Sequence, residues 1–177
     1  MGFRSADRFV LTVPDVISCD LRVLFVGVNP GIRSSQTRHH FAHPSGRFWK
    51  ALQAGGFMPE VLQPAEEEKL LEYGLGLTNL VDRPTQSADL LTSDELRAGA
   101  RRLRRKACLY RPRWVAVLGV VAYRVAFEAP QAVVGPEERR LCSSRVWVLP
   151  GPTGRNAHYP LPRLIEEFRR LRIASED

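Results

Sequence analysis

Three short turns combine small residues with single polar side chains in a pattern suited to ligand binding. Asn29 begins the turn Asn29-Pro-Gly31, Asn79 follows Thr78, and the third turn reads Gly151-Pro-Thr-Gly154. Glycine lets a backbone approach a ligand closely, and an amide side chain supplies both a hydrogen-bond donor and an acceptor. Neither the P-loop pattern nor the dinucleotide-binding glycine pattern is present. An Asn before a Pro is also common turn chemistry, so a functional role for Asn29 depends on where the other turns lie.

The elements that carry these turns alternate between strands and helices. The predicted strands are Arg22–Val28, Leu75–Val81, Trp114–Leu118 and Arg145–Leu149; the predicted helices are Pro44–Ala54, Pro64–Tyr73, a helix capped by Thr92 that ends near Tyr110, Val120–Phe127 and Pro160–Ile173. This alternation predicts an α/β fold, a three-layer α/β/α sandwich with a mostly parallel central sheet, in one domain spanning residues 1–177. Ligands of such folds bind outside the carboxyl ends of the strands, so we expect the three turns to meet at one crevice.

Composition and cysteine usage indicate an ordinary globular protein. Apolar residues make up 44% of the 177 residues, and the longest apolar run, Trp114–Tyr123, is about half of what a membrane span needs. The stretch from Met1 to Pro14 is too weakly apolar for a secretory signal. Three scattered cysteines, Cys19, Cys108 and Cys142, predict reduced thiols in a cytoplasmic protein. Residues 132–142 are expected to form a surface excursion.

The charge balance favours a polyanionic partner. Lysine and arginine number 26 against 19 acidic residues, a net charge of +7, and all but Lys50, Lys69 and Lys106 of the basic residues are arginine. Arginine suits bidentate contact with phosphate, although a codon bias in the source genome accounts for the excess equally well. The basic helix that ends near Tyr110 has an apolar stripe for the core, formed by Leu96, Ala100, Leu103 and Ala107. Its arginines are interpreted as a solvated face, with DNA contact as the alternative.

Five segments together resemble the mismatch-specific uracil and thymine DNA glycosylases, family 2 of the uracil-DNA glycosylase superfamily. They are Gly27–Gly31, His39–Lys50, Leu77–Thr85, Glu95–Gly99 and Trp147–Arg155, and they follow the order and spacing of that family. The resemblance implies the uracil-DNA glycosylase fold and a DNA glycosylase that needs neither metal nor cofactor. It also implies a monomer whose partner is double-stranded DNA, with no membrane association.

The resemblance assigns roles to residues in the first two turns. Asn29 would position the water that attacks the sugar, and since an amide is a poor general base, we expect a slow enzyme. Phe41 would stack on a base flipped out of the duplex, with packing in the core as the alternative. Ile32, His40 and Asn79 would complete the base-binding set, the Asn79 amide matching the edge of uracil or thymine. For His40, a structural role is an equal alternative.

The third turn would contact the DNA around the flipped nucleotide. Arg155 would plug the gap in the duplex and bond to the orphaned guanine, while Thr153, Gly154 and Asn156 would hold the backbone. Phe48 and Trp49 lie in a predicted helix and are assigned to the core. Asp82 beside Arg83 is interpreted as an ion pair rather than as a catalytic acid.

The predicted function is hydrolysis of the N-glycosidic bond of uracil opposite guanine in duplex DNA, the first step of base excision repair. Thymine and modified pyrimidines in mismatches are further candidate substrates. Two alternatives remain open: a catalytically silent module that binds mismatched DNA, and a hydrolase of free nucleosides or nucleotides.

Overall fold

A computed structural model describes residues 12–177, and its centre is a five-stranded sheet. The strands are β1 (Val23–Gly27), β2 (Leu75–Asn79), β3 (Trp114–Leu118), β4 (Gly135–Leu141) and β5 (Ser144–Leu149), in the order β2-β1-β3-β5-β4. The first four in this order pair in parallel, and only β4 runs antiparallel, beside β5. Most of the stretch weighed as a secretory signal, residues 1–11, lies outside the described residues.

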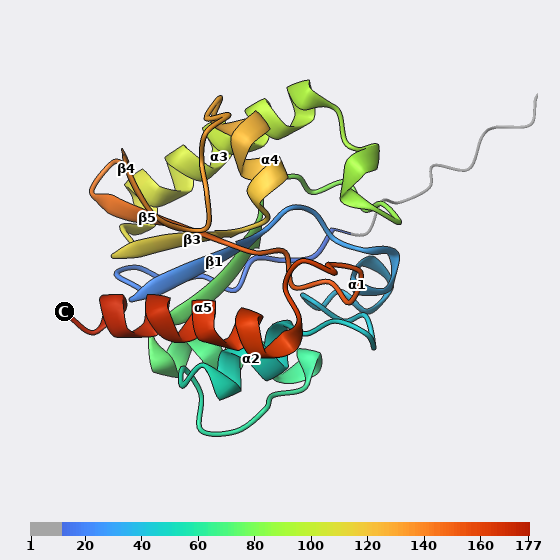
Figure 1. Cartoon of the computed structure of the whole chain (residues 1–177), viewed down its shortest axis with the longest axis vertical. Coiled ribbons are helices and arrows are strands. Elements are labelled where there is room, and N and C mark those ends of the chain that lie inside the picture. Colours follow the sequence, from blue (N-terminus) through green and yellow to red (C-terminus); the bar gives the residue numbers. More distant parts are fainter. Residues whose placement is uncertain (1–11) are drawn as a thin grey trace, which may run out of the picture.

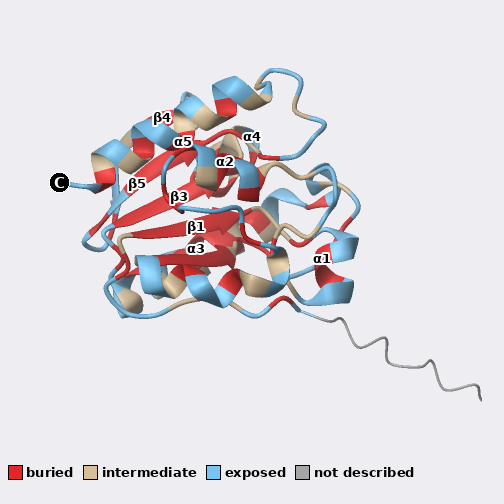
Figure 2. Ribbon diagram, turned by 90° about the horizontal axis from the view of Figure 1, so that it is seen from below, coloured by how far each residue is buried: buried red, intermediate tan, exposed pale blue. Residues whose placement is uncertain are grey.

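Helices cover both faces of this sheet (Figure 1). One face packs against α2 (Phe48–Ala54), η1 (Pro64–Tyr73, a 3₁₀ helix) and α5 (Leu161–Ser175), and the other against α3 (Ser93–Tyr110) and α4 (Val120–Ala126). Alternate residues of β1 point to opposite faces, since Phe25 belongs to the first core cluster and Leu24 to the second. Figure 2 shows the buried residues gathered along the strands and on the inward sides of the helices. The predicted α/β sandwich is confirmed.

The elements with strong local signals lie close to their predicted bounds. Thr92 caps α3 by accepting a hydrogen bond from the Glu95 backbone, and the Glu95 side chain accepts one from the Thr92 backbone in return. The four residues of the predicted apolar stripe on α3 are all buried, as are Phe48 and Trp49. Of the helices the structure describes, none combines the length and the apolar character that a membrane span requires.

Three elements were not predicted, the shortest of which is the 3₁₀ helix η2 (Ala88–Leu90). β4 reads Gly-Pro-Glu-Glu-Arg-Arg-Leu, and a charged sequence of this kind is typical of an edge strand that must not pair further. Residues 132–142, expected to be a surface excursion, thus contribute a strand to the sheet. The third element is α1 (Ile32–Thr37), which is short and polar and lies directly after the Asn29-Pro-Gly31 turn.

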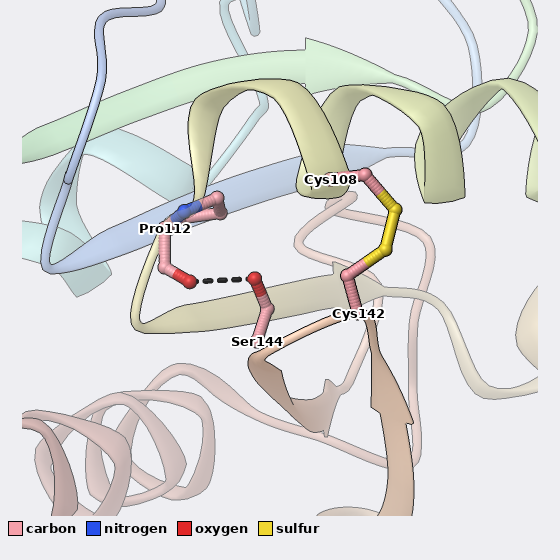
Figure 3. Close-up of a disulfide and its surroundings, with 4 residues drawn as sticks. All are labelled: Cys108, Pro112, Cys142 and Ser144. Atoms are coloured by element: carbon pink, nitrogen blue, oxygen red, sulfur yellow. Dashed lines mark hydrogen bonds between the residues drawn. A yellow bond between two sulfur atoms is a disulfide. The ribbon is translucent and has the colours of Figure 1, made fainter.

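The prediction of three reduced thiols is wrong for two of them. Cys108, near the end of α3, forms a disulfide with Cys142 in the β4–β5 turn, and their Cα atoms are 5.3 Å apart (Figure 3). In the same region the Ser144 hydroxyl donates a hydrogen bond of 2.6 Å to the Pro112 carbonyl. Cys19 is free and exposed. The disulfide ties α3 to the edge of the sheet, and cysteine usage no longer supports the predicted reducing compartment.

Candidate base-binding and catalytic site

Gly27, the last residue of β1, brings together two of the predicted base-binding side chains. A Cβ atom added to Gly27 would lie 2.5 Å from Asn79 Oδ1 and 3.3 Å from Phe41 Cζ. Asn79 is the register partner of Gly27 on the neighbouring strand β2. Because glycine has no side chain, the amide and the aromatic ring both close over the end of β1. The Asn79 amide forms no hydrogen bond with any residue that the structure describes.

Asn29 is held in one orientation by the segment that follows β2. Its Nδ2 donates hydrogen bonds to the Arg83 carbonyl at 2.9 Å and to Thr85 Oγ1 at 2.7 Å. The Thr85 hydroxyl in turn donates to the Ser87 carbonyl at 2.7 Å, so it can only accept from Asn29. Both amide hydrogens of Asn29 are therefore committed, and its Oδ1 is the atom left to accept a hydrogen bond from a ligand or a water molecule.

Backbone hydrogen bonds join the same two segments. Leu80 N donates to the Gly27 carbonyl at 2.9 Å, Val81 N to the Val28 carbonyl at 3.0 Å, and Thr85 N to the Pro30 carbonyl at 3.1 Å. The turn after β1 and the segment after β2 thus extend together beyond the edge of the sheet. The position of Asn29 relative to Asn79 is consequently set by main-chain contacts.

Phe41 lies outside the regular elements, with one face of its ring covered. The ring stacks on Phe48 at a centroid distance of 4.1 Å and an interplanar angle of 21°. It is only partly buried, although it packs against the first core cluster. The Phe41 backbone has φ of 51°, a left-handed conformation that bulky residues rarely adopt. The ring thus packs on the core and is also partly exposed, and its stacking on a flipped base stays a prediction.

A buried carboxylate fixes the backbone next to Phe41. Glu67, in η1, is 5% exposed, and its Oε2 accepts a hydrogen bond of 2.8 Å from His40 N. Its Oε1 lies 3.1 Å from His39 Nδ1. The His40 ring is buried and donates from Nε2 to the Pro14 carbonyl at 2.9 Å. Desolvation by burial lowers the pKa of His40, which favours its neutral form. These contacts fit the structural alternative for His40, and its role at the base stays a prediction.

Arg47 attaches the third turn to the site. Arg47 N donates to the Pro152 carbonyl at 3.0 Å, and its guanidinium donates to the Thr153 carbonyl at 2.7 Å and the Tyr159 carbonyl at 2.6 Å. A Cβ atom on Gly154 would come within 2.9 Å of the Ser45 carbonyl. The loop that contains Phe41 therefore leads into Arg47, which holds the third turn in place. In Figure 1 this turn lies near α1.

Within the third turn the predicted DNA-contacting residues differ in their contacts. Asn156 closes the turn, because its Nδ2 donates to the Gly151 carbonyl at 3.1 Å and its backbone N to the Thr153 carbonyl at 3.2 Å. Arg155 is exposed, and its side chain forms no hydrogen bond or ion pair with a residue in the described range. Ile32, at the start of α1, is also exposed, at 43%.

A comparison with known families identifies the group of proteins to which the chain belongs. The family model described as the uracil DNA glycosylase superfamily matches residues 14–171, which is most of the chain. The chain belongs to the uracil DNA glycosylase superfamily. Superfamily membership makes it a glycosylase, a hydrolase of N-glycosyl bonds that acts on DNA.

A solved structure supports the fold of this glycosylase. The solution NMR structure of a candidate uracil DNA glycosylase from Methanosarcina acetivorans superposes with a TM-score of 0.61 and 16% sequence identity, covering 92% of this chain and 98% of that chain. At this identity the likeness concerns the fold alone. The predicted fold is confirmed.

One ion pair in the glycosylase differs from the prediction. Arg83 pairs with Glu95 rather than with Asp82, through contacts of 2.7 Å and 3.0 Å. The hydrogen bond from Arg83 and that from the Thr92 backbone lower the pKa of Glu95 to about 2. Asp82 is exposed. The pair joins the start of α3 to Arg83, the residue whose carbonyl accepts a hydrogen bond from Asn29.

Three positioning residues of the glycosylase were not singled out from the sequence. Thr85 and Arg47 lie inside segments that carry the family resemblance, which was the available signal. Glu67 is one of several glutamates in an acidic stretch, and nothing in its local sequence distinguishes it from Glu66 or Glu68. Only the structure shows that Glu67 is buried and that its carboxylate holds the backbone of the loop at His40.

Proposed function

We propose that this glycosylase is a mismatch-specific, monofunctional enzyme that removes uracil opposite guanine from double-stranded DNA in base excision repair. Thymine and modified pyrimidines in mismatches are proposed as further substrates. The observation that carries the proposal is that the Phe41 ring and the Asn79 amide both close over Gly27, two residues before Asn29, whose amide is fixed by Thr85.

Phe41 and Asn79 would receive the flipped base. The ring can stack on a base, a contact worth about 1–3 kcal/mol when bases bind to aromatic side chains. The Asn79 amide has a donor and an acceptor free of protein partners among residues 12–177, and a pyrimidine edge presents the complementary pair. Because Phe48 supports the ring from behind, the base would meet a surface that is already in position.

Asn29 would orient the attacking water. Because Nδ2 is occupied by Arg83 and Thr85, Oδ1 can accept a hydrogen bond from a water molecule. This hydrogen bond would direct a lone pair of the water oxygen toward the anomeric carbon of the sugar. An amide does not take a proton readily, so the reaction would depend on a sugar that develops oxocarbenium character and on a base that leaves easily. Slow turnover and a preference for bases that are easily extruded follow, and mismatched bases are the least costly to extrude.

Arg155 would occupy the space left in the duplex. Its side chain is exposed and uncommitted within the described part of the chain, while Arg47 holds the turn beneath it. From that space a guanidinium can donate to the O6 atom of the orphaned guanine, which would favour guanine as the partner base.

The decisive experiment uses a duplex with one G·U pair, treated with alkali after incubation to cleave abasic sites. We expect strand scission with the native protein and none with Asn29→Ala, while both bind the duplex. Free deoxyuridine tested in parallel should remain intact. Tight binding without scission would favour the silent mismatch-binding module, and release of uracil from deoxyuridine would favour the nucleoside hydrolase.

A further inference from the structure

A hollow lined with arginine lies between α3, α4 and β4, on the side of the sheet opposite α2 and α5. Its volume is about 270 Å³. The basic residues that line it are Arg97, Arg101 and Arg104 of α3 and Arg139 and Arg140 of β4. Glu128 is the only acidic residue among the lining residues. The hollow therefore concentrates positive charge away from the turns that carry Asn29 and Arg155.

Two of these arginines are uncommitted. Arg97 pairs with Asp94 at 2.9 Å, and Arg139 donates to the Phe127 carbonyl at 2.9 Å. Arg101 and Arg104 are exposed, and neither forms a hydrogen bond or an ion pair within the part of the chain that the structure describes. Residues spaced by three or four positions lie on the same side of a helix, so both guanidinium groups are available to one ligand.

The disulfide joins the two walls of the hollow. Cys108 lies four positions beyond Arg104 on α3, and Cys142 follows Arg140 by two positions, in the turn directly after β4. The arginines of the helix and those of the strand therefore stand on elements that are covalently connected (Figure 3). A ligand that spans both walls would meet a prearranged set of charges.

We propose that this hollow is a second polynucleotide site, which binds the phosphate backbone of DNA outside the segment that contains the lesion. The planar guanidinium matches phosphate geometry and binds it in bidentate fashion. The apolar residues of the lining, Ala100, Ala126, Phe127 and Leu141, are buried, so an acidic peptide would find no exposed aromatic or aliphatic anchor. Binding at this site does not depend on the proposed chemistry at Asn29.

The test compares Arg101→Glu with Arg105→Glu. Both residues are exposed on α3 and free of partners among residues 12–177, but only Arg101 lines the hollow.

Binding to an undamaged duplex is measured by fluorescence anisotropy across a salt series. We expect Arg101→Glu to weaken binding at low salt at least fivefold and to reduce the slope of log affinity against log salt by about 1. Arg105→Glu should change affinity less than twofold, and circular dichroism should show both variants folded. Equal losses in the two variants would overturn the proposal, because the effect would then reflect net charge alone.

A competition assay and an excision assay complete the test. Polyglutamate of matched total charge should not displace the duplex. Equal competition by polyglutamate would identify an acidic protein as the partner and overturn the polynucleotide assignment.

Single-turnover excision of uracil at saturating protein should be unchanged in Arg101→Glu. If the native protein releases no uracil from G·U duplex but Arg101→Glu still loses binding selectively, the hollow is supported and the proposed enzymatic function fails. If the native protein excises uracil normally but Arg101→Glu shows no selective loss of duplex binding, the proposed enzymatic function is supported and the proposal for the hollow fails.

Discussion

The amide of Asn29 donates a 2.7 Å hydrogen bond to the hydroxyl of Thr85, which lies 56 residues further along the chain. The Thr85 hydroxyl donates its own hydrogen bond to the Ser87 carbonyl, so it can only accept from Asn29. This relationship leaves Asn29 Oδ1 as the acceptor and makes Thr85 a positioning residue rather than a catalytic one.

Replacing Thr85 with Val should therefore slow excision without preventing binding of the duplex. Valine keeps the branched shape but can neither accept from Asn29 nor donate to the Ser87 carbonyl. The hydrogen bond that Asn29 loses, about 1.4 kcal/mol, corresponds to a tenfold slower chemical step. Single-turnover kinetics on G·U duplex measure the rate, and anisotropy measures the binding. Thr85→Ser should restore most of the rate; if it is as slow as Thr85→Val, the hydroxyl is not what positions Asn29.

Gly27→Ala tests the contact between Asn79 and the end of β1. The new methyl would overlap Asn79 Oδ1 at 2.5 Å, and overpacking of this kind costs about 1–3 kcal/mol in the free energy of unfolding. Excision should fall at least tenfold as the amide is displaced. In the double variant Gly27→Ala/Asn79→Ala, the stability lost in urea denaturation should partly return while activity stays low. Strict additivity of the two changes would show that the residues do not compete for this space.

Arg155→Ala should alter the preference for the base opposite uracil. The native protein is expected to favour G·U over A·U, and truncation should bring the two excision rates closer because the guanine loses its bonding partner. Excision assays on both duplexes measure the ratio. Arg163→Ala, a change in α5, is a control for loss of positive charge and should retain the native ratio. An unchanged preference in Arg155→Ala would reject the role as a plug.

The burial of His40 predicts a loss of stability in weak acid. Burial lowers the pKa of His40 in the folded protein below its ordinary value of 6.5, so the unfolded chain takes up the proton first as the pH falls. The free energy of unfolding should consequently decrease as the pH falls below about 6.5, by at most about 1.4 kcal/mol per pH unit from this group. Urea denaturation at a series of pH values measures this slope. His40→Gln, which keeps a side-chain donor but does not titrate, should flatten it; an equally steep slope would assign the effect to other groups.

Reduction of the Cys108–Cys142 disulfide should destabilise the protein. The bond closes a loop across a sequence separation of 34, and cross-links of this kind contribute about 2–4 kcal/mol by restricting the unfolded chain. Urea denaturation with and without a reductant measures the difference. Cys108→Ser/Cys142→Ser should be insensitive to the reductant, whereas Cys19→Ser should behave as the native chain does. A native chain whose stability is unaffected by reduction would contradict this prediction.

The parts of the fold that were predicted well are those whose information is local. Trp114–Leu118 is a continuous apolar run and forms β3 with the expected bounds, and the capping residues Thr92 and Glu95 mark the start of α3. The edge strand β4 was missed because its exposed, charged residues lack the apolar pattern of a buried strand. The disulfide was missed because a separation of 34 residues carries no information on whether two cysteines meet.

By itself the sequence determined the α/β class, the core-facing stripe of α3 and the segments that carry the superfamily resemblance. These follow from the chemistry of neighbouring residues and from motif order. Only the tertiary structure decided that Phe41 and Asn79 close over Gly27, that Thr85 orients Asn29, and that Glu67 and Arg47 hold the surrounding turns. Each of these relationships joins chain segments through hydrogen bonds or close packing, and such contacts depend on the register and twist of the assembled sheet, which no single segment encodes.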